Sequence, residues 1–566
     1  MCGIFGAVSR AHNISPSIIT ALYHLSYRGY DSSGVCLDIG QLHVQKTTGD
    51  VSNLTQPQPF ARVGIGHTRW ATHGLANIKN AHPHTSHKSV AVVHNGIIQN
   101  YRALKKDLIL QGYHFTSETD SEVIAHLMHS LLKTHCVKEA LIALRSLLKG
   151  RYATAILLAN DPAIHGVTSH MPLLIGYNDD MWCLSSDVSA LKQCQHYARV
   201  PPETSFSLTD HGVNILLDFV PIPDSPIEPD DLQNITHHEI MSQPNIPHLV
   251  FSAWKNTHVP RMPDAHQNVL ALACGSSFHC SEVMTCWLDN FGIHSRCILA
   301  SEYKHLPARD LSKTVVIVVS QSGETADTLL ALQKAKELSP ALTLAVTNVT
   351  TSTLSSYCDA TVPLNAGQEI GVASTKAVTA QLLALFLLSQ HIAQKKPTVP
   401  VTDLETEINA VLKLTLSPFA STLSQYQHIF CLGSHTCLTI AKEFALKLKE
   451  LAYIHAEAIP CGELKHGPLA LIDQKVLCII IGQSNCPQTA AVQSEIEARG
   501  GSVTRILYGA QTTQSTKDTI ALHGRLESLS VIPLNIVCQV VAYEAARLLC
   551  RPIDRPRNLA KSVTVE

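Results

Sequence analysis

The chain has 566 residues and a formal net charge of −2 at pH 7, with 45% hydrophobic and 16% charged residues. This length is too great for a single hydrophobic core and predicts two to four globular domains, and the near-neutral charge offers no basic field for nucleic acid. The most apolar stretches, 382–388 and 531–550, are too short or are interrupted by polar residues, so we expect no membrane span.

The first informative residue is the cysteine at position 2, in the run MCGIFG. If the initiator methionine is removed, Cys2 carries both a thiol and the free α-amine of the chain. The amine has a pKa of about 7.7–8.0 and the thiol of about 8.5, so the amine can accept the proton of its own side chain. Position alone favours the simpler interpretation that a small residue follows Met1 by chance. The motifs downstream decide between the two interpretations.

Short polar motifs follow Cys2 in the next 120 residues. They are YRGYDS at 27–32, GHTRWATHG at 66–74, AHPH at 81–84, VHNG at 93–96 and SETD at 117–120. The planar fork of Arg69 can hold a carboxylate through two parallel hydrogen bonds. A lone arginine is more often a solvated surface charge, so this residue gains its meaning from its neighbours.

Two of these motifs also have a purely structural interpretation. Asp120 can pair with a substrate ammonium group, but residues 119–122 also fit a capping box that opens a helix over 123–132. Asn95 and Gly96 can supply an amide and a backbone N–H to an oxyanion, but the same pair also fits a hairpin turn between apolar runs. The residues alone leave both alternatives open.

Together these motifs resemble the glutaminase domain of the class II glutamine amidotransferases, an N-terminal-nucleophile family with an αββα fold, over residues 2–215. The resemblance implies that Cys2 attacks the amide of glutamine and releases ammonia, and that water then hydrolyses the glutamyl thioester. It also implies that Asn95 and Gly96 form the oxyanion hole and that Trp70 gates the passage of ammonia. The glutamine-binding residues that it implies are Arg69, Trp70, Thr72, His73 and Asp120.

A second architecture follows a segment rich in proline and acid, 216–245, which predicts a linker. The pattern strand, turn, helix then occurs twice. The first copy is at 269–274, 275–277 and 278 onward, and the second is at 428–432, 433–434 and 436 onward. The glycines at positions 275 and 433 are 158 positions apart, which indicates a duplicated domain.

The alternation of strands and helices favours doubly wound parallel sheets, an αβα sandwich in each copy. We expect the first copy to span 246–395, the second 396–550, and a tail to occupy 551–566. In the first copy a strand at 314–319 runs into SQSGET at 320–325, just before a helix. Hydroxyl and N–H groups at a helix N-terminus bind anions such as phosphate, although the same residues also cap helices that hold no ligand.

The second copy contains the candidate acid and base groups. Glu443, Lys447 and Glu450 are spaced i, i+4 and i+7 on one face of an expected helix. Flanking apolar residues favour a buried helix over a surface stripe of ion pairs. His466 can titrate near neutrality, although a lone histidine is more often structural. A mixed tail such as 554–566 would ordinarily fray.

The run SQSGET resembles the signature of the sugar isomerase (SIS) family. This resemblance implies that hydroxyl and amide groups of the first copy hold a sugar phosphate. The residues concerned are Ser277, Ser320, Gln321, Ser322, Thr325 and Ser374.

A glutaminase domain, two SIS copies and this tail together resemble the family of isomerising glutamine:fructose-6-phosphate aminotransferases. The resemblance implies that D-fructose 6-phosphate and L-glutamine become D-glucosamine 6-phosphate and L-glutamate, the first step of hexosamine and UDP-N-acetylglucosamine biosynthesis, in a homodimer. It makes His466 the ring-opening catalyst, Lys561 the Schiff-base partner of the ketose carbonyl, and Glu450 the group that moves a proton from C1 to C2. The other residues that it implies, for the substrate and for the ammonia route, are Glu443, Lys447, Ala560 and Val563.

The chain departs from this family at Gly433-Ser434-His435, where Gly-Arg-Gly is usual, which removes the basis for an arginine contact there. Two alternative functions do not fit the sequence. A phosphoribosyl-type amidotransferase would need a phosphoribosyl-pyrophosphate loop with paired acidic residues after a strand, and the sequence has none. A non-catalytic sugar-phosphate sensor would have lost its chemistry-bearing residues, whereas Cys2, Glu450, His466 and Lys561 are all present.

We expect neither a metal nor another cofactor. The histidines at 82, 84 and 87 are closely spaced, but no matching cysteine or carboxylate spacing supports a metal site. The 17 cysteines include no Cys-x-x-Cys pair, which indicates free thiols in a reducing compartment. The amino terminus lacks the basic region and long apolar core of a secretory signal, so we expect a cytoplasmic protein.

Overall fold

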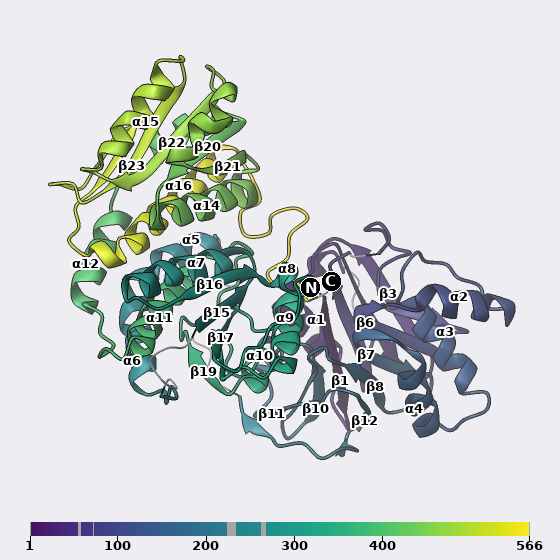
Figure 1. The fold of residues 1–566 in the computed structure, drawn as a ribbon. Coiled ribbons are helices and arrows are strands. Elements are labelled where there is room, and N and C mark those ends of the chain that lie inside the picture. Colours follow the sequence, from purple (N-terminus) through teal and green to yellow (C-terminus); the bar gives the residue numbers. More distant parts are fainter. Residues whose placement is uncertain (1, 55–57, 72, 223–233, 262–267, 565–566) are drawn as a thin grey trace. The chain divides into compact units, whose positions relative to one another are not determined.

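The computed structural model describes residues 2–54, 58–71, 73–222, 234–261 and 268–564. Contacts between residues divide the chain into two compact units, Met1–Pro229 with Ser562–Glu566, and Asp230–Lys561 (Figure 1). Residues from the end of the chain therefore belong to the first unit, in which the side chains of Ser562 and Thr564 are buried.

The first unit contains mainly strands, with a few helices. The strands are β1 (Gly3–Ser9), β2 (Ser32–Asp38), β3 (Leu42–Thr48), β4 (Val63–Arg69), β5 (His84–Ser86), β6 (Val90–Ile98), β7 (Gly150–Leu158), β8 (Ile164–Ser169), β9 (Leu174–Tyr177), β10 (Met181–Ser185), β11 (His196–Arg199), β12 (Thr204–Thr209), β13 (Gly212–Val213) and β14 (Val220–Pro221). The α-helices are α1 (Ser15–Leu25), α2 (Tyr101–Leu110), α3 (Glu122–Leu131) and α4 (Val137–Leu147).

These elements form four layers. An eight-stranded sheet, β14-β11-β9-β10-β1-β4-β2-β3, faces a six-stranded sheet, β13-β12-β8-β7-β6-β5, and the named strands pair antiparallel. Apolar side chains such as Ile4, Val93 and Phe206 fill the space between the sheets. Helix α1 packs on the outer face of the first sheet, and α2, α3 and α4 pack on the outer face of the second. This arrangement is the predicted αββα fold.

The second unit alternates strands and helices. Its strands are β15 (Asn268–Ala273), β16 (Ser295–Leu299), β17 (Thr314–Val319), β18 (Leu342–Thr347), β19 (Ala360–Pro363), β20 (His428–Gly433), β21 (His455–Pro460), β22 (Val476–Gln483), β23 (Ser502–Tyr508), β24 (Gln514–Ser515) and β25 (Thr519–Leu522). Its α-helices are α5 (Ile235–Met241), α6 (Ile246–Lys255), α7 (Gly275–Asn290), α8 (Ala300–Tyr303), α9 (Ala326–Glu337), α10 (Thr353–Tyr357), α11 (Lys376–Ile392), α12 (Val401–Leu412), α13 (Ser417–Leu423), α14 (Thr436–Lys447), α15 (Pro487–Glu497) and α16 (Val531–Leu548).

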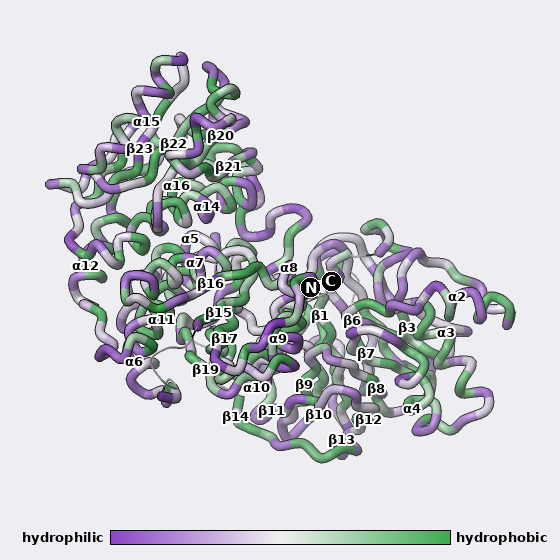
Figure 2. The backbone as a smooth tube through the Cα atoms, viewed as in Figure 1, coloured by the Kyte–Doolittle hydropathy of each residue, from purple (hydrophilic) through white to green (hydrophobic). Residues whose placement is uncertain are grey.

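Two mostly parallel sheets organise this unit. The first has the order β16-β15-β17-β18-β19 and is wholly parallel, and the second has the order β21-β20-β22-β23-β25-β24, with only the edge strand β24 antiparallel. Helices α7, α11, α14 and α16 lie in one core that joins the two sheets. Figure 2 shows hydrophobic residues gathered along the central strands and hydrophilic residues on outer helices such as α9. The architecture is the predicted pair of αβα domains.

Some boundaries differ from the sequence-based expectations. The first turn of α7 begins at Gly275, where a separate turn over 275–277 was predicted. Ordered structure also enters the expected linker, 216–245, from both sides. Strand β14 pairs with β11 in the first unit, and α5 buries Thr236 and Glu239 in the second. The intervening residues 223–233 lie outside the described part of the chain.

One stretch among the described residues, Glu527–Leu548, is long and apolar enough to cross a membrane by length and composition. Most of its apolar window, 89%, is buried inside the unit. Helix α16 supplies nearly all of this stretch and contributes to the core between the two parallel sheets, which accounts for its composition.

Candidate active sites

Cys2 lies directly before β1, in the middle of the eight-stranded sheet. Strand β4 pairs with β1 and ends at Arg69, which places Trp70 beside the thiol. The backbone N–H of Trp70 donates to Cys2 Sγ at 3.3 Å, and Sγ donates to the Trp70 carbonyl oxygen at 3.4 Å. Burial raises the pKa of the Cys2 thiol above its ordinary value. A buried thiol of this kind needs a neighbouring base before it can act as a nucleophile.

Asn95 and Gly96 lie inside β6, where they pair with Ala153 and Tyr152 of β7. The alternative of a hairpin turn at this pair is therefore wrong. The Asn95 amide Nδ2 donates to the Cys2 carbonyl oxygen at 3.0 Å, and its Oδ1 lies 3.1 Å from His67 Nε2. Burial lowers the pKa of His67 to about 3, so the ring is neutral and its Nε2–H fixes the orientation of the amide.

The guanidinium of Arg69 is buried and binds the loop that follows it. It donates to the carbonyl oxygens of His73 at 2.5 Å, Gly74 at 3.2 Å and Leu75 at 3.3 Å. These bonds shape one wall of the cavity in front of Cys2. The predicted residues that line this cavity are Cys2, Arg69, Trp70, His73, Gly96 and Asp120, while Thr72 lies outside the described residues.

Asp120 does not belong to a capping box. Its carboxylate accepts a hydrogen bond from the backbone N–H of Ile98 at 2.8 Å, across to β6. Helix α3 starts after Ser121, whose side chain makes no capping bond. The Glu122 carboxylate accepts from the backbone N–H of Ser117 instead of reaching back to the start of the helix. The capping-box alternative is wrong because the Glu122 carboxylate that the motif would use binds Thr116 and Ser117, which precede the helix.

The closely spaced histidines of this unit are hydrogen-bonded groups of the interior. His82 stacks on His67 with ring centroids 4.1 Å apart, and His84 Nε2 lies 3.0 Å from Thr119 Oγ1. Burial lowers the pKa of both His82 and His84, so both rings are neutral. Across the described residues no group of three or more metal-binding side chains converges on one point.

In the second unit, the SQSGET loop begins where β17 ends. Ser320 Oγ lies 3.1 Å from Thr325 Oγ1 and accepts from the backbone N–H of Gly323 at 3.1 Å. Gly323 has φ +65°, and a Cβ there would lie 2.0 Å from Ser352 Oγ, so the loop needs glycine at this position. Ser277 lies in the first turn of α7, just after the carboxyl end of the neighbouring strand β15. Because β15 and β17 are parallel, Ser277 and the SQSGET loop lie at the same edge of the sheet.

Ser374 and Lys561 meet at a buried carboxylate that the sequence did not single out. Ser374 Oγ donates to Glu369 Oε2 at 3.1 Å, and Lys561 Nζ forms an ion pair with the same oxygen. Lys561 also donates to the Gly371 carbonyl at 2.8 Å. Burial would raise the pKa of Glu369, but Lys561 and backbone N–H groups lower it. Glu369 therefore stays ionised and pairs with Lys561.

Glu443, Lys447 and Glu450 form a buried ion-pair cluster. Lys447 Nζ lies 3.3 Å from Glu443 Oε1 and 2.6 Å from Glu450 Oε2, with only 1% of the lysine side chain exposed. The helix widens into a π-turn over Leu448–Ala452, which carries Glu450 beside the lysine at i+3. The surface-stripe alternative is wrong.

The cluster joins the two parallel-sheet domains of the second unit. Ser276 Oγ and His279 Nδ1 of α7 lie 2.8 Å and 2.7 Å from the Glu443 carboxylate on α14. Burial alone would raise the pKa of Glu443, but Lys447 and His279 lower it to about 2. Burial would lower the pKa of Lys447, but Glu443 and Glu450 raise it well above its ordinary value. Lysine and glutamate thus remain charged together.

His466 is not brought to this cluster within one chain. It lies at the end of a short 3₁₀ helix, Cys461–His466, and its side chain is exposed. Within the described part of the chain it makes no hydrogen bond or ion pair. Its predicted role in ring opening stays a prediction.

Comparisons with known proteins match both halves of the chain. The model of a glutamine amidotransferase domain matches residues 67–193, and the SIS domain matches twice, at 263–389 and 422–546. Proteins named glutamine–fructose-6-phosphate aminotransferase (isomerizing) from Pseudomonas syringae pv. tomato and Aquifex aeolicus are each 37% identical, with 100% of both chains covered. The chain belongs to the isomerising glutamine–fructose-6-phosphate aminotransferases. The predicted duplication of the SIS domain is confirmed.

A solved structure of the C-terminal domain of a glucosamine-fructose-6-phosphate aminotransferase from Francisella tularensis is also similar. It is 28% identical with a TM-score of 0.49, and the match covers 58% of this chain and 100% of that one.

The departure from this aminotransferase family at 433–435 has a structural consequence. His435 adopts φ +52°, a conformation that favours glycine, at the position where the family usually has one. Ser434 Oγ donates to Gln488 Oε1 at 3.0 Å, so the turn binds the neighbouring helix α15. The arginine position of the family is occupied here by a serine with a structural contact.

Glu239 and Glu369 are residues of the sugar half that the sequence analysis missed. Glu239 Oε1 accepts from the backbone N–H groups of Ile370 at 2.5 Å and Gly371 at 3.1 Å, and so holds the segment between Glu369 and Ser374. No local pattern singles out either residue, because their partners are distant in sequence: Glu369 and Lys561 are 192 positions apart.

We expect Gly96→Ala to damage both the stability and the glutaminase step. Gly96 has φ +114°, and a Cβ there would lie 2.1 Å from the Arg151 carbonyl oxygen. Relieving this clash must move the strand. If Gly96 has its predicted role as an oxyanion donor, its displacement costs about 10²-fold or more in turnover. Thermal melting and glutamate release measure the two effects. Gly112→Ala is the control, because Gly112 has φ +88° but nothing within 4 Å of its Cβ, and equal behaviour of the two variants would contradict the prediction.

The buried Glu239 carboxyl makes the stability of the second unit depend on pH. Burial and the nearby Glu369 raise its pKa to about 7, against the neighbouring charge of Lys561. An unfolded glutamate has a pKa of about 4.3, so this group stabilises the fold below pH 4 and its contribution is lost as the pH rises to about 7.

Glu239→Gln removes this titration and keeps an oxygen that can accept the two backbone bonds. We expect the free energy of unfolding of the variant, relative to wild type, to increase by about 2.5 kcal/mol between pH 5 and pH 8. Urea denaturation at the two pH values measures the change. Glu457→Gln, at an exposed position, serves as the control, and a pH-independent difference for Glu239→Gln would refute the prediction.

Proposed function

We propose that the chain converts D-fructose 6-phosphate and L-glutamine into D-glucosamine 6-phosphate and L-glutamate. The observation that carries the proposal is that one chain of this family contains two sites with the side chains that the two half-reactions need. One is a cavity that collects Cys2, Arg69, Gly96 and Asp120. The other is a parallel-sheet unit in which Lys447 and Lys561 form ion pairs with buried glutamates.

In the first half-reaction the α-amine of a mature Cys2 takes the thiol proton, and the thiolate attacks the side-chain amide carbon of glutamine. The Asn95 amide and the Gly96 N–H would stabilise the oxyanion. Arg69 would face the α-carboxylate and Asp120 the α-ammonium group. The C–N bond breaks, ammonia leaves with the transferred proton, and water later cleaves the thioester to give glutamate.

In the second half-reaction the phosphate of the sugar would lie in the SQSGET loop, with Ser277 and Ser374 at the sugar hydroxyls. Lys561 must give up its proton to condense with the open-chain ketose carbonyl, and water leaves. Ammonia then displaces the lysine to give the fructose imine. Glu450 takes a proton from C1 and returns it at C2, which forms the aminoaldose. Lys447, which stays protonated, supplies a fixed positive charge beside Glu450 during this transfer.

We also propose a cytoplasmic homodimer that binds neither nucleic acid nor membrane. The free state of all 17 cysteines supports a reducing compartment. The exposed, unpartnered His466 supports a dimer, because a second copy can bring this residue to a site that it does not reach within one chain.

The test is a coupled assay on the purified protein. We expect glucosamine 6-phosphate from fructose 6-phosphate with either glutamine or ammonium as the nitrogen source. Glucose 6-phosphate in place of fructose 6-phosphate serves as the control, since an aldose offers no C2 carbonyl. Glutamine hydrolysis without amino-sugar formation from either nitrogen source would reject the proposed substrate.

A further inference from the structure

A cavity of about 230 Å³ lies on the first parallel sheet of the second unit. Its lining includes Asn268 and Thr314, the first residues of β15 and β17. The SQSGET loop starts after the other end of β17, and a strand of six residues spans about 17–20 Å. The cavity is therefore separate from the sugar-phosphate loop and has no part in the proposed reaction.

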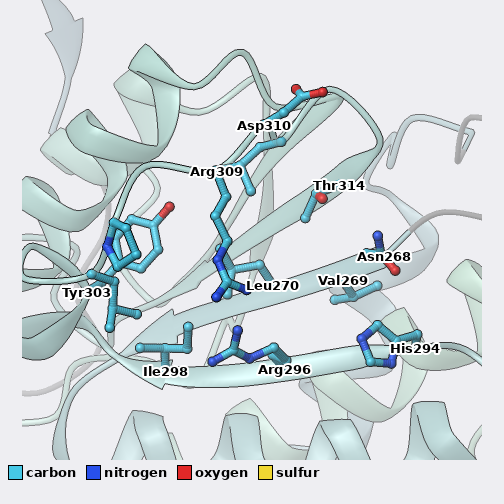
Figure 3. Close-up of a pocket in the computed structure, with 13 residues that line it drawn as sticks. Asn268, Val269, Leu270, His294, Arg296, Ile298, Tyr303, Arg309, Asp310 and Thr314 are labelled. Atoms are coloured by element: carbon cyan, nitrogen blue, oxygen red, sulfur yellow. The ribbon is translucent and has the colours of Figure 1, made fainter.

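Two arginines, Arg296 and Arg309, point into this cavity from different segments. Arg296 is opposite Leu270 in the parallel register of β16 and β15, so both side chains stand on the same face of the sheet. Figure 3 shows the guanidinium groups of Arg296 and Arg309 directed toward the same space above Leu270 and Ile298. Among the described residues neither guanidinium has a hydrogen bond, an ion pair or a ring contact.

The acidic residue of the lining does not neutralise these charges. The Asp310 carboxylate accepts from the backbone N–H of Ser312 at 2.8 Å and from its Oγ at 2.9 Å. Figure 3 shows this carboxylate directed away from the two guanidinium groups. Two positive charges thus face one small space without a counter-ion, an arrangement whose mutual repulsion a bound anion would relieve.

The chemistry of the lining narrows the class of anion. Each guanidinium can bind two oxygens in parallel, and a phosphate monoester carries the two negative charges that match two arginines, whereas a carboxylate carries one. The rest of the floor is apolar, with Val269, Leu270, Ile298, Leu306 and Pro307. Apolar surface favours a ligand with a carbon skeleton over inorganic phosphate, and the volume limits that skeleton to about one ring.

We propose that this cavity binds a small organic phosphate monoester, with its phosphate between Arg296 and Arg309 and its carbon skeleton on Leu270 and Ile298. Isothermal titration calorimetry with phenyl phosphate tests the site. The wild-type protein binds phenyl phosphate more tightly than inorganic phosphate, and it does not bind phenol. The double variant Arg296→Gln/Arg309→Gln weakens phenyl phosphate binding at this site at least tenfold.

The control variant Arg499→Gln/Arg525→Gln removes two exposed arginines from the second domain of the same unit and leaves phenyl phosphate binding unchanged. Any binding of the probe to the SQSGET loop is common to all these proteins and cancels in the comparison. Glutamine-dependent and ammonium-dependent activities of both double variants stay at the wild-type level, which shows that each is folded. Equal binding of phenyl phosphate to wild type and Arg296→Gln/Arg309→Gln overturns the proposal. The proposal also fails if the two arginines are needed to bind poly-glutamate but not to bind phenyl phosphate.

Discussion

Replacing Cys2 with alanine abolishes glutamine-dependent formation of glucosamine 6-phosphate and leaves ammonium-dependent formation intact. Among the described residues that line the first cavity, Cys2 alone carries a thiol that can form the thioester. Removal of a covalent nucleophile costs about 10⁴-fold or more in turnover. The second unit has its own core and its own ionised groups, so the loss of one side chain in the first unit leaves it unaffected. Amino-sugar formation with each nitrogen source is the measurement.

Cys136→Ala provides the matched control, because Cys136 is an exposed thiol of the same unit. This variant keeps both activities. Glutamine-dependent synthesis by Cys2→Ala at more than a hundredth of the wild-type rate would refute the role of Cys2. Loss of the ammonium-dependent activity as well would show that the two halves do not work independently.

The elements could be predicted from the sequence where local patterns and tertiary structure agree. The strand at 314–319 is buried at every position, and its apolar run predicted it. The SQSGET loop could also be predicted, because glycine is required at position 323, where φ is positive. The alternation of strands and helices also predicted the parallel sheets of the second unit. The αββα architecture was accessible only through family resemblance, since periodicity does not reveal which sheet packs on which.

The sequence-based alternatives failed where a long-range contact replaces a local one. Asn95-Gly96 is a strong turn signal, yet both residues remain in β6 because β7 pairs along its whole length. The Asp120 carboxylate binds a strand and not its own helix. Glu239 and Glu369 have no local pattern, since their function depends on partners that only the fold brings near.

Replacing Lys447 with methionine eliminates amino-sugar formation and destabilises the second unit by about 3–5 kcal/mol. The lysine side chain is 1% exposed and neutralises two glutamates at once. Without it, Glu443 is a buried carboxylate whose remaining partners are Ser276 and His279. The variant keeps its glutaminase activity, because Cys2 lies in the other unit. Urea denaturation and the two activity assays measure these effects.

The nearby Lys442 is a stringent control, because it also forms an ion pair, with Glu282 at 2.7 Å, but its side chain is 34% exposed. Exposed ion pairs contribute about 1 kcal/mol or less, so Lys442→Met leaves both stability and synthesis close to wild type. Equal losses of stability and synthesis in Lys447→Met and Lys442→Met would mean that burial of the ion-pair cluster contributes to neither property.

A double variant separates charge burial from chemistry. Lys447→Met leaves the Glu443 carboxylate without its main counter-ion, and Glu443→Gln removes that carboxylate. The double variant is therefore more stable, by about 1–3 kcal/mol, than the sum of the two single changes in unfolding free energy predicts. It stays inactive in amino-sugar formation, because the positive charge beside Glu450 is still missing. Recovery of activity together with stability would show that Lys447 only supports the fold. Additive losses of stability would show that Lys447 and Glu443 are not coupled, and that their ion pair does not contribute to the stability of the second unit.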